Sequence, residues 1–329
     1  MNGDAPLVSI LLIAFQQEST VAQAVAGALS QTYSPLEIVL SDDASSDNTF
    51  AAMQAAVAGY TGPHHIVLNR NPANLGIGAH LSHLVSLSKG QMLFVAAGDD
   101  VSLPQRCERV MLAWRASDQR LDLIAAALID VDETGHTGAT ITPSDLATYH
   151  NAADWLTRPP FVVGAAQAWT RRVFERFGPL PQGVVAEDLV MVLRAVMSGG
   201  AVTLAEPLVR YRRGGLSFRR RAQSAGDVVK ALLKNNRSSL VELPLLLQDA
   251  RSAGQLAAIE PALLARLARE HFVRDLFAAG SLPARGRCVL NAGDVPLAVR
   301  LRLFVYAACP ALLAPFFWLK RTLKPKRSS

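Results

Sequence analysis

The stretch QMLFVAAGDDVSLP, residues 91–104, is an apolar run that ends in two adjacent aspartates, Asp99 and Asp100. A carboxylate beside a buried strand is costly unless a positive group meets it. Mg²⁺ and Mn²⁺ commonly bind one or two carboxylates and take their other ligands from water and substrate phosphates. The pair therefore predicts a divalent-cation site, in which one acid binds the cation and the other a sugar hydroxyl or a metal-bound water. The alternative is a turn whose acids, or Ser102, cap a helix that starts near Pro104.

A second acidic pair, Asp42 and Asp43, directly follows the apolar run LEIVL. Asp, Ser and Asn crowd turns because their side chains bond the local backbone, so a turn explains part of the stretch SDDASSDNT. The expected helix cap is Ser46 or Asp47, however, and the acid pair precedes it. Carboxylates at the end of a strand are suited to accept hydrogen bonds from a nucleobase or a ribose, and Phe15, at the end of the first strand, could stack on the base.

A third acidic pair, Glu187 and Asp188, stands at the start of the helix expected in VVAEDLVMVLRAVMSGG. Acids at this position are favoured by the helix macrodipole by roughly 0.3–1 kcal/mol, which is a sufficient structural explanation. Neighbouring residues on a helix point about 100° apart. Only one of the two carboxylates can therefore face a cleft.

Two other groups of polar residues look like sites but have simpler explanations. Asp130 and Asp132 form a literal D-x-D, yet they lead into ETGHTG and are typical of a hairpin turn. His80 and His83 lie in one expected helix without an acidic or cysteine partner at metal-ligand spacing. We therefore expect these histidines on a solvent-exposed helix face.

The elements that must position the acids alternate between strand and helix through the first half of the chain. Continuous apolar runs of strand length predict a mostly parallel sheet covered by helices on both faces, a doubly wound α/β fold. Ligands bind such sheets beyond the carboxyl ends of the strands. Phe15 and the two acid pairs that follow strands should therefore meet at one edge. The strands are expected over residues 7–15, 36–40, 65–69 and within 91–104, and the helices over 20–29, 48–60 and 76–88.

The net charge of the chain indicates which classes of binding partner to expect. The 329 residues contain 33 Lys and Arg against 27 Asp and Glu, a net charge of +6, which favours anionic partners such as phosphorylated substrates or membrane surfaces. Aromatic residues are too sparse around the basic run at Arg219–Arg221 for a single-stranded nucleic-acid platform, so we expect no nucleic acid. Three scattered cysteines imply no disulfide framework and indicate a reducing compartment.

The C-terminal region has a different character. Residues 303–319, LFVYAACPALLAPFFWL, carry no charge and have basic flanks, and Pro310 and Pro315 interrupt them. This composition fits an interfacial membrane anchor, and the alternative is a buried helical hairpin. We expect three parts, namely a catalytic domain over 1–221, a helical extension over 222–299 and a membrane-associating segment over 300–329. The protein would then be cytoplasmic and peripheral on the inner face of the cell membrane.

Taken in order, these stretches resemble the family 2 glycosyltransferases of the GT-A fold, inverting enzymes that use nucleotide-diphospho-sugars. VSILLIAFQQESTVAQAVAGALSQTYSPLEIVLSDDASSDNT is similar to the opening of that family. NLGIGAHLSHLVSLSKGQMLFVAAGDD is similar to its Asn-x-Gly helix, Lys-Gly turn and metal-binding strand, and VAEDLVMVLRAVMSGG resembles its Glu-Asp helix. The likeness covers roughly residues 6–217.

The resemblance implies a role for each matching residue. Phe15 would stack on the base and Asp42 would bond it, while Asp99 would contact ribose or sugar. Asp100, or Asp99 in its place, would ligate Mg²⁺ or Mn²⁺, and Asp188 would deprotonate the acceptor hydroxyl. The remaining residues assigned to the catalytic and nucleotide sites by the same likeness are Glu187, Asp43, Asn74 and Arg212.

The chain departs from the family pattern at several positions. Gln16 replaces the usual Asn, and Ala44 replaces the usual Gly after the acid pair. Tyr-Arg-x-His is common after the last strand, but here Gly214 stands where the His would be, which leaves Arg212 or Arg213 as substitutes.

The resulting hypothesis is a glycosyltransferase that moves a sugar onto a glycan or a lipid-linked glycan at the membrane. A sugar-nucleotide nucleotidyltransferase is an alternative, but AFQQEST after the first strand lacks the Gly-rich, basic phosphate loop expected of one. A non-catalytic, membrane-bound scaffold of the same fold is the other.

Overall fold

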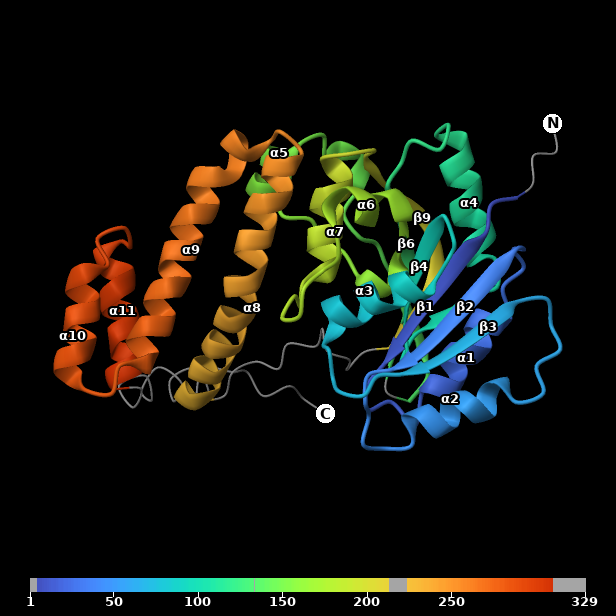
Figure 1. Ribbon diagram of the computed structural model, residues 1–329, viewed down its shortest axis with the longest axis horizontal. Helices are drawn as coiled ribbons and strands as arrows, with labels where there is room; N and C mark the ends of the chain where they lie inside the picture. The colour runs from blue at the N-terminus through green and yellow to red at the C-terminus, as the bar shows by residue number, and fades with distance from the viewer. Residues whose placement is uncertain (1–4, 133, 213–223, 310–329) are drawn as a thin grey trace, which may run out of the picture. The chain divides into compact units, whose positions relative to one another are not determined.

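A computed structural model describes residues 5–132, 134–212 and 224–309 (Figure 1). The chain divides into two compact units. The first comprises Met1–Phe218 with Gln248–Ala258, and the second comprises Arg219–Leu247 with Ile259–Ser329. The expected boundary between residues 221 and 222 lies outside the described residues, as does most of the expected membrane segment, from residue 310 onward.

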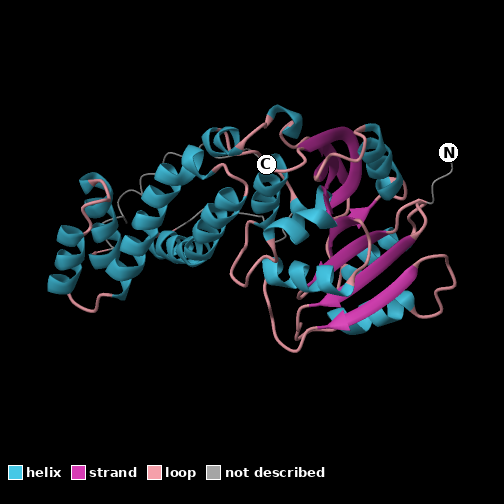
Figure 2. Ribbon diagram, turned by 45° about the horizontal axis from the view of Figure 1, so that its top comes forward, coloured by secondary structure: helices cyan, strands magenta, loops and turns pink. Residues whose placement is uncertain are grey.

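The described part of the first unit is built on one nine-stranded sheet in the order β3-β2-β1-β4-β8-β6-β9-β5, with β7 paired to β6 (Figure 2). β1 is parallel to β2 and β4, β2 is parallel to β3, and β6 is parallel to β9, whereas β8 is antiparallel to both of its neighbours. The mostly parallel α/β sheet is confirmed. The strands are β1 Val8–Ala14, β2 Leu36–Asp42, β3 His65–Arg70, β4 Met92–Ala97, β5 Val101–Ser102, β6 Leu123–Val131, β7 Thr137–Ile141, β8 Gln167–Thr170 and β9 Ala201–Arg212.

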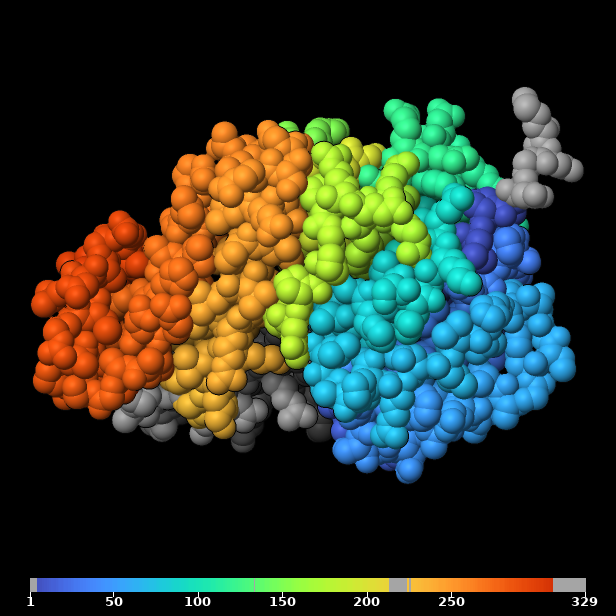
Figure 3. Space-filling view, viewed as in Figure 1, coloured from blue at the N-terminus to red at the C-terminus, as the bar shows by residue number. Residues whose placement is uncertain are grey.

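Helices cover the sheet on both faces because the central strands are apolar on both sides. Ile10 and Leu12 of β1 belong to a core that also takes in buried side chains of α1, α2 and α4, while Leu11 between them is equally buried. α3 contacts β1 and β2 on the other face, which the cyan atoms of Figure 3 cover. The helices of this unit are α1 Val21–Leu29, α2 Thr49–Val57, α3 Ile77–Leu87, α4 Arg106–Ala116, α5 Ala152–Thr157, α6 Arg171–Phe177 and α7 Glu187–Val196, with short 3-10 turns at Leu146–Thr148 and Gly164–Ala166.

The C-terminal helical region is confirmed. It consists of α8 Ala225–Ser252, α9 Leu256–Ala278, α10 Leu282–Asn291 and α11 Leu297–Ala308. The second unit has its own small apolar core around Phe272, Leu276 and Leu303. Across the described ranges, none of the helices combines the length and the hydropathy needed to cross a membrane.

The two groups of polar residues set aside above have different outcomes. The hairpin at Asp130 and Asp132 is confirmed, since β6 and β7 are antiparallel and the Asp132 N–H donates to the His136 carbonyl at 3.0 Å. The exposed position expected for His80 is wrong, because only 2% of its surface is exposed. His80 is four residues from Leu84 on α3, so it shares the face that the helix turns towards the sheet.

Candidate active site

The ends of three parallel strands lie in register at one edge of the sheet. Ala14 pairs with Asp42 across β1 and β2, and Ile13 pairs with Ala97 across β1 and β4. Phe15 and the acids that follow β2 and β4 are therefore brought to the same edge, as the apolar runs predicted. Phe15 exposes 43% of its surface there, so its ring is accessible to a ligand.

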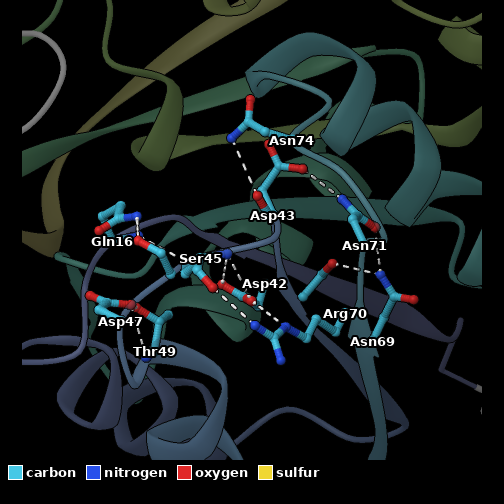
Figure 4. A network of polar contacts seen from close by, with 12 residues as sticks. Gln16, Asp42, Asp43, Ser45, Asp47, Thr49, Asn69, Arg70, Asn71 and Asn74 are labelled. Atoms are coloured by element: carbon cyan, nitrogen blue, oxygen red, sulfur yellow. Dashed lines mark hydrogen bonds and ion pairs between the residues drawn. The ribbon is translucent and has the colours of Figure 1, made fainter.

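Asp42 is fully buried at the end of β2. Its carboxylate forms an ion pair with the Arg70 Nε at 3.2 Å and accepts the Ser45 N–H at 3.1 and 3.3 Å (Figure 4). The Arg70 side chain is half-exposed, which weakens the ion pair through solvent screening. Asp42 thus fixes the turn after β2 and neutralises an arginine at the sheet edge.

Asp43 and Asn74 organise the loop between β3 and α3. One Asp43 oxygen accepts the Asn71 Nδ2 at 2.8 Å and the Leu75 N–H at 2.9 Å, and the other accepts the Gly76 N–H at 3.0 Å. The Asn74 Nδ2 in turn donates to the Asp43 carbonyl at 3.3 Å, as Figure 4 shows. These contacts give both residues a structural role at the site, and their direct contact with a nucleotide stays a prediction.

Gln16 and Ala44, the two departures from the family pattern in this region, both adopt left-handed backbone conformations. Their φ angles are 57° and 59°. The Gln16 N–H donates to the Ser45 Oγ at 2.9 Å, and the Gln16 Nε2 donates to the Ser46 Oγ at 2.7 Å. The turn after β1 is therefore bonded to the turn after β2, at the cost of strain at Ala44, whose side chain disfavours this conformation.

The tip after β4 carries Asp99 and Asp100. Asp100 is 5% exposed, and its Oδ1 accepts the backbone N–H of Arg212 at 2.9 Å. Burial, together with the neighbouring Asp99, raises the pKa of Asp100 to about 8. Burial also raises the pKa of Asp99, although the charge of Arg212 opposes the rise. The Arg212 Nη2 donates to the Gln23 Oε1 at 3.0 Å and so ties the end of β9 to α1.

The donor set at this tip fits a hard divalent cation. It offers two adjacent carboxylates, and their pKa values are raised chiefly by burial. In the described part of the chain no cluster of three or more Asp, Glu, His or Cys side chains could hold a metal by itself. Asp99 and Asp100 therefore suit Mg²⁺ or Mn²⁺, which take their remaining ligands from water and phosphate oxygens.

A cavity of about 340 Å³ adjoins the tip. Asp99 and Arg212 line it together with Arg210 of β9 and residues of the β6–β7 hairpin, among them Thr134 and Thr137. It offers guanidinium, hydroxyl and carboxylate groups side by side, a combination suited to a phosphorylated or hydroxylated ligand.

Glu187 and Asp188 begin α7, as predicted. Glu187 is buried and Asp188 is half-buried, so Asp188 is the more accessible of the two acids. A Cβ at Gly164 would lie 2.6 Å from the Glu187 Oε1, which explains why a glycine faces this helix end. The Gln167 Nε2 donates to the Asp188 carbonyl at 3.3 Å.

Sequence reasoning missed Arg106 and Gln167. Arg106 is the first residue of α4 and is fully buried, with its Nη1 donating to the Ser102 Oγ at 2.9 Å and its Nη2 to the Gln167 carbonyl at 3.1 Å. Burial lowers the pKa of Arg106 to about 10. A basic residue in the first turn of a helix opposes the macrodipole, and this was the available signal for Arg106. Gln167 lies in a run of small and apolar residues, and no sequence signal indicated its role.

The comparisons with known proteins identify the family and the fold. The family model described as Glycosyl transferase family 2 matches residues 9–178 of the 329. The chain belongs to glycosyl transferase family 2. It is therefore a glycosyltransferase, and the resemblance inferred from the motifs is confirmed. Arg213 and Gly214, at the family's Tyr-Arg-x-His position, lie outside the described residues.

A curated relative and two solved structures illustrate the family 2 likeness. The putative glycosyltransferase EpsE of Bacillus subtilis is 28% identical over 248 residues, which is 74% of this chain and 86% of EpsE. The structure of S. aureus TarS 1-349 in complex with UDP-GlcNAc aligns over 98% of this chain and 93% of that one, with 14% identity and a TM-score of 0.56. The mannosyltransferase PcManGT of Pyrobaculum calidifontis, in complex with GDP-Man and Mn²⁺, aligns over 94% and 87% with 16% identity and a TM-score of 0.52. At these identities the two structures support the fold.

Proposed function

We propose that this family 2 glycosyltransferase moves a sugar from a nucleotide-diphospho-sugar to a hydroxyl group of a glycan or lipid-linked glycan, with inversion at the anomeric carbon, during the synthesis of a cell-surface polysaccharide. The observation that carries the proposal is the register of β1, β2 and β4, which brings Phe15, Asp42 and Asp99 to one edge of the sheet. An aromatic ring suits the base of such a donor, and carboxylates suit its ribose hydroxyls and, with a divalent cation between them, its diphosphate.

The donor-binding roles follow from the surroundings of each residue. Phe15, exposed at the end of β1, stacks on the base. Asp42 is buried and bound to Arg70 and the Ser45 N–H, so its hydrogen bond to the base is assigned from the family likeness. Asp43 and Asn74 hold the loop that borders the nucleotide. Arg212 contributes positive charge beside Asp99, where the diphosphate lies.

Asp100, with Asp99 beside it, would hold Mg²⁺ or Mn²⁺. The cation would supply positive charge to neutralise the diphosphate leaving group. The contact between Asp100 and the Arg212 backbone keeps one carboxylate oxygen oriented.

Asp188 is the general base. An inverting transfer needs one positioned base within ~2.6–3.2 Å of the acceptor hydroxyl, on the side of the sugar opposite the leaving diphosphate. Asp188 is the more accessible acid at the start of α7, while Glu187 is buried against Gly164. Asp188 accepts the hydroxyl proton as the oxygen attacks, and Glu187 supports the helix end.

The known relatives support the donor class. TarS 1-349 binds UDP-GlcNAc, and PcManGT binds GDP-Man with Mn²⁺. Both are nucleotide-diphospho-sugars, and the second complex includes one of the two cations that suit Asp99 and Asp100. The particular nucleotide and sugar differ between the two relatives, so a panel of donors is needed.

We further propose that the protein is peripheral on the cytoplasmic face of the membrane and contacts it through residues 300–329. The α10–α11 hairpin supports this part. Four of its leucines have more than half of their surface exposed, and Arg287 and Arg302 on the same hairpin are exposed as well. Exposed leucines beside arginines are suited to an anionic lipid surface. The leucines and their exposed fractions are Leu282 58%, Leu290 79%, Leu297 57% and Leu301 52%.

The proposal is tested by incubating the full-length protein with UDP-, dTDP- and GDP-sugars in the presence of Mg²⁺ or Mn²⁺. We expect cation-dependent release of one nucleoside diphosphate, accelerated by a hydroxylated acceptor. Release of pyrophosphate from a nucleoside triphosphate and a sugar phosphate would instead identify a nucleotidyltransferase. Absence of turnover together with absence of thermal stabilisation by any nucleoside diphosphate would identify a non-catalytic scaffold.

A further inference from the structure

Arg106 is a buried cation whose hydrogen bonds go to neutral groups, and its charge also interacts with that of Asp100. Its guanidinium bonds the Ser102 hydroxyl and the Gln167 carbonyl, and its Cζ lies 5.7 Å from the centre of the Phe94 ring. The Nε atom is buried and has no hydrogen-bond partner. Among the residues that the structure describes, Arg106 forms no direct ion pair with a carboxylate.

A second buried arginine in the same unit shows what a purely structural arrangement looks like. Arg194 of α7 is equally inaccessible, but its Nε lies 2.7 Å from the Asp249 Oδ2 and its Nη2 lies 3.3 Å from the Asp249 Oδ1. A buried charge with a direct bidentate partner loses less on desolvation than one without. The unit therefore keeps a costly charge at Arg106 where a neutral side chain would pack more cheaply, and such sites are enriched for function.

The position of Arg106 indicates what the protein gains from burying this charge. Its fork of donors joins two chain segments that are far apart in sequence, because Ser102 follows the Asp99–Asp100 tip and Gln167 begins β8. The Gln167 side chain then continues the connection, since its Nε2 donates to the Asp188 carbonyl at 3.3 Å. Its Oε1 accepts the Trp169 Nε1 at 2.7 Å, which fixes the orientation of the amide.

We propose that Arg106 is a positioning residue that holds the Asp99–Asp100 tip and, through Gln167, the start of α7 at Asp188 in one fixed arrangement. The Arg106 guanidinium also places permanent positive charge within electrostatic reach of Asp100. Second-layer partners of this kind change metal affinity or activity by about 10–100-fold when they are removed. The inference rests on the proposed function, in which the tip binds the cation and Asp188 is the base.

The test compares Arg106→Lys with Arg194→Lys as a matched control. Lysine keeps the charge, but its single ammonium cannot hold Ser102 and the Gln167 carbonyl in the geometry of the arginine fork. Two measurements are made on the full-length protein: the rise in Tm caused by Mn²⁺ in the presence of UDP, dTDP or GDP, and kcat and KM with the donor found in the panel. We expect Arg106→Lys to lower kcat by about tenfold or more, with a smaller change in donor KM, and to weaken the Mn²⁺ response.

Arg194→Lys should lower Tm without affecting the Mn²⁺ response or kcat below its unfolding temperature. The inference is wrong if Arg106→Lys keeps the wild-type kcat and the wild-type Mn²⁺ response. It is also wrong if Arg194→Lys loses kcat and the Mn²⁺ response to the same degree as Arg106→Lys. Should Arg106→Lys fail to fold, Gln167→Met keeps the backbone carbonyl that accepts from Arg106 and removes the side-chain hydrogen bonds to the Asp188 carbonyl and the Trp169 Nε1. It should lower kcat and spare the Mn²⁺ response, and an unchanged kcat would overturn the inference. The Mn²⁺ response does not depend on Asp188. It therefore still tests the role of Arg106 at the Asp99–Asp100 tip if the general base is assigned wrongly or if no donor is turned over.

Discussion

The backbone N–H of Arg212 donates a 2.9 Å hydrogen bond to the Oδ1 of Asp100, a residue 112 positions earlier in the chain. The contact exists because β5 pairs with β9, with Val101 opposite Arg210. It fixes one oxygen of the buried Asp100 carboxylate against the backbone of β9. The acid tip is thus oriented by the last strand of the sheet, and the following predictions build on that arrangement.

Asp100→Asn and Asp99→Asn should separate the two acids. Asparagine at position 100 keeps an oxygen for the Arg212 N–H but loses the negative charge, so the rise in Tm caused by Mn²⁺ with a nucleoside diphosphate should disappear. Asp99→Asn should keep that rise and increase donor KM, because Asp99 contacts ribose or sugar. The reverse pattern in thermal unfolding would exchange the two assignments.

Asp188→Asn should reduce transfer by about 10²–10⁴-fold, the usual contribution of a general base, while leaving nucleotide binding intact. The measurement combines initial rates at saturating donor with calorimetric titration of the nucleoside diphosphate. Glu175→Gln, an exposed acid on α6, is the matched control and should behave as wild type. Retained turnover in Asp188→Asn would remove this residue from the mechanism.

Ala44→Gly should stabilise the protein by about 0.5–1 kcal/mol. The φ of 59° strains an alanine by roughly 1–2 kcal/mol, and the additional unfolded-state freedom of glycine offsets about 0.5–1 of this. Ala58→Gly is the control, because the exposed Ala58 has an ordinary φ of −60° and should lose about 0.5–1 kcal/mol instead. Urea unfolding measures the change in the free energy of unfolding for each variant. An equal loss of stability in both variants would contradict the strain at Ala44.

Stability should fall below pH 6.5 through His80. Burial lowers the pKa of His80 to about 4 despite the nearby carboxylate of Asp43, so the folded protein keeps this histidine neutral while the unfolded chain protonates it near 6.5. The contribution of neutral His80 to the free energy of unfolding is fully present above pH 6.5. It is lost progressively as the pH falls towards 4, by about 3 kcal/mol in total.

Urea unfolding between pH 4.5 and 8 should therefore show a shallower decline for His80→Gln than for wild type. At pH 8 the variant should lose only local contacts, such as the 2.7 Å hydrogen bond between the His80 Nε2 and the Ser41 Oγ. An identical pH slope in the two proteins would show that His80 does not carry this dependence.

Removal of residues 310–329 should abolish sedimentation with vesicles that contain phosphatidylglycerol. A truncation at residue 300 would be uninformative, because it removes Leu303, which is buried in the core of the second unit. Leu297→Ser and Leu301→Ser should each weaken vesicle binding by about tenfold, since each removes apolar surface from the contact. Leu264→Ser, an exposed leucine of α9, should have no effect. Unchanged binding by the truncated protein would refute a membrane contact through residues 310–329, and unchanged binding by both leucine variants would refute one through α11.

The sequence predicted the first half of the sheet and its acidic edge closely. Solid apolar runs such as residues 7–15 can only be buried on both faces, and parallel strands with helical connections satisfy that requirement. The positions of Phe15, Asp42 and Asp99 follow from where those runs end. The prediction for His80 failed because its partners, Ser41 and Asp43, lie at the end of β2, far from His80 in the sequence. No local sequence pattern therefore indicates that this polar residue is buried.

By itself, the sequence determined the fold class and the acids at the strand ends, because hydrophobic periodicity and local turn chemistry act between near neighbours. The glycosyltransferase family followed from the resemblance of its motifs, taken in order, to that family. The tertiary structure alone decided the insertion of β8 between β4 and β6, the contact between Arg212 and Asp100, and the burial of Arg106 against Gln167. Those contacts depend on strand order and register between segments that are distant in the chain. They leave no periodic trace in the residues that make them, since a hydrogen bond between two strands constrains their relative placement and not the local pattern of either.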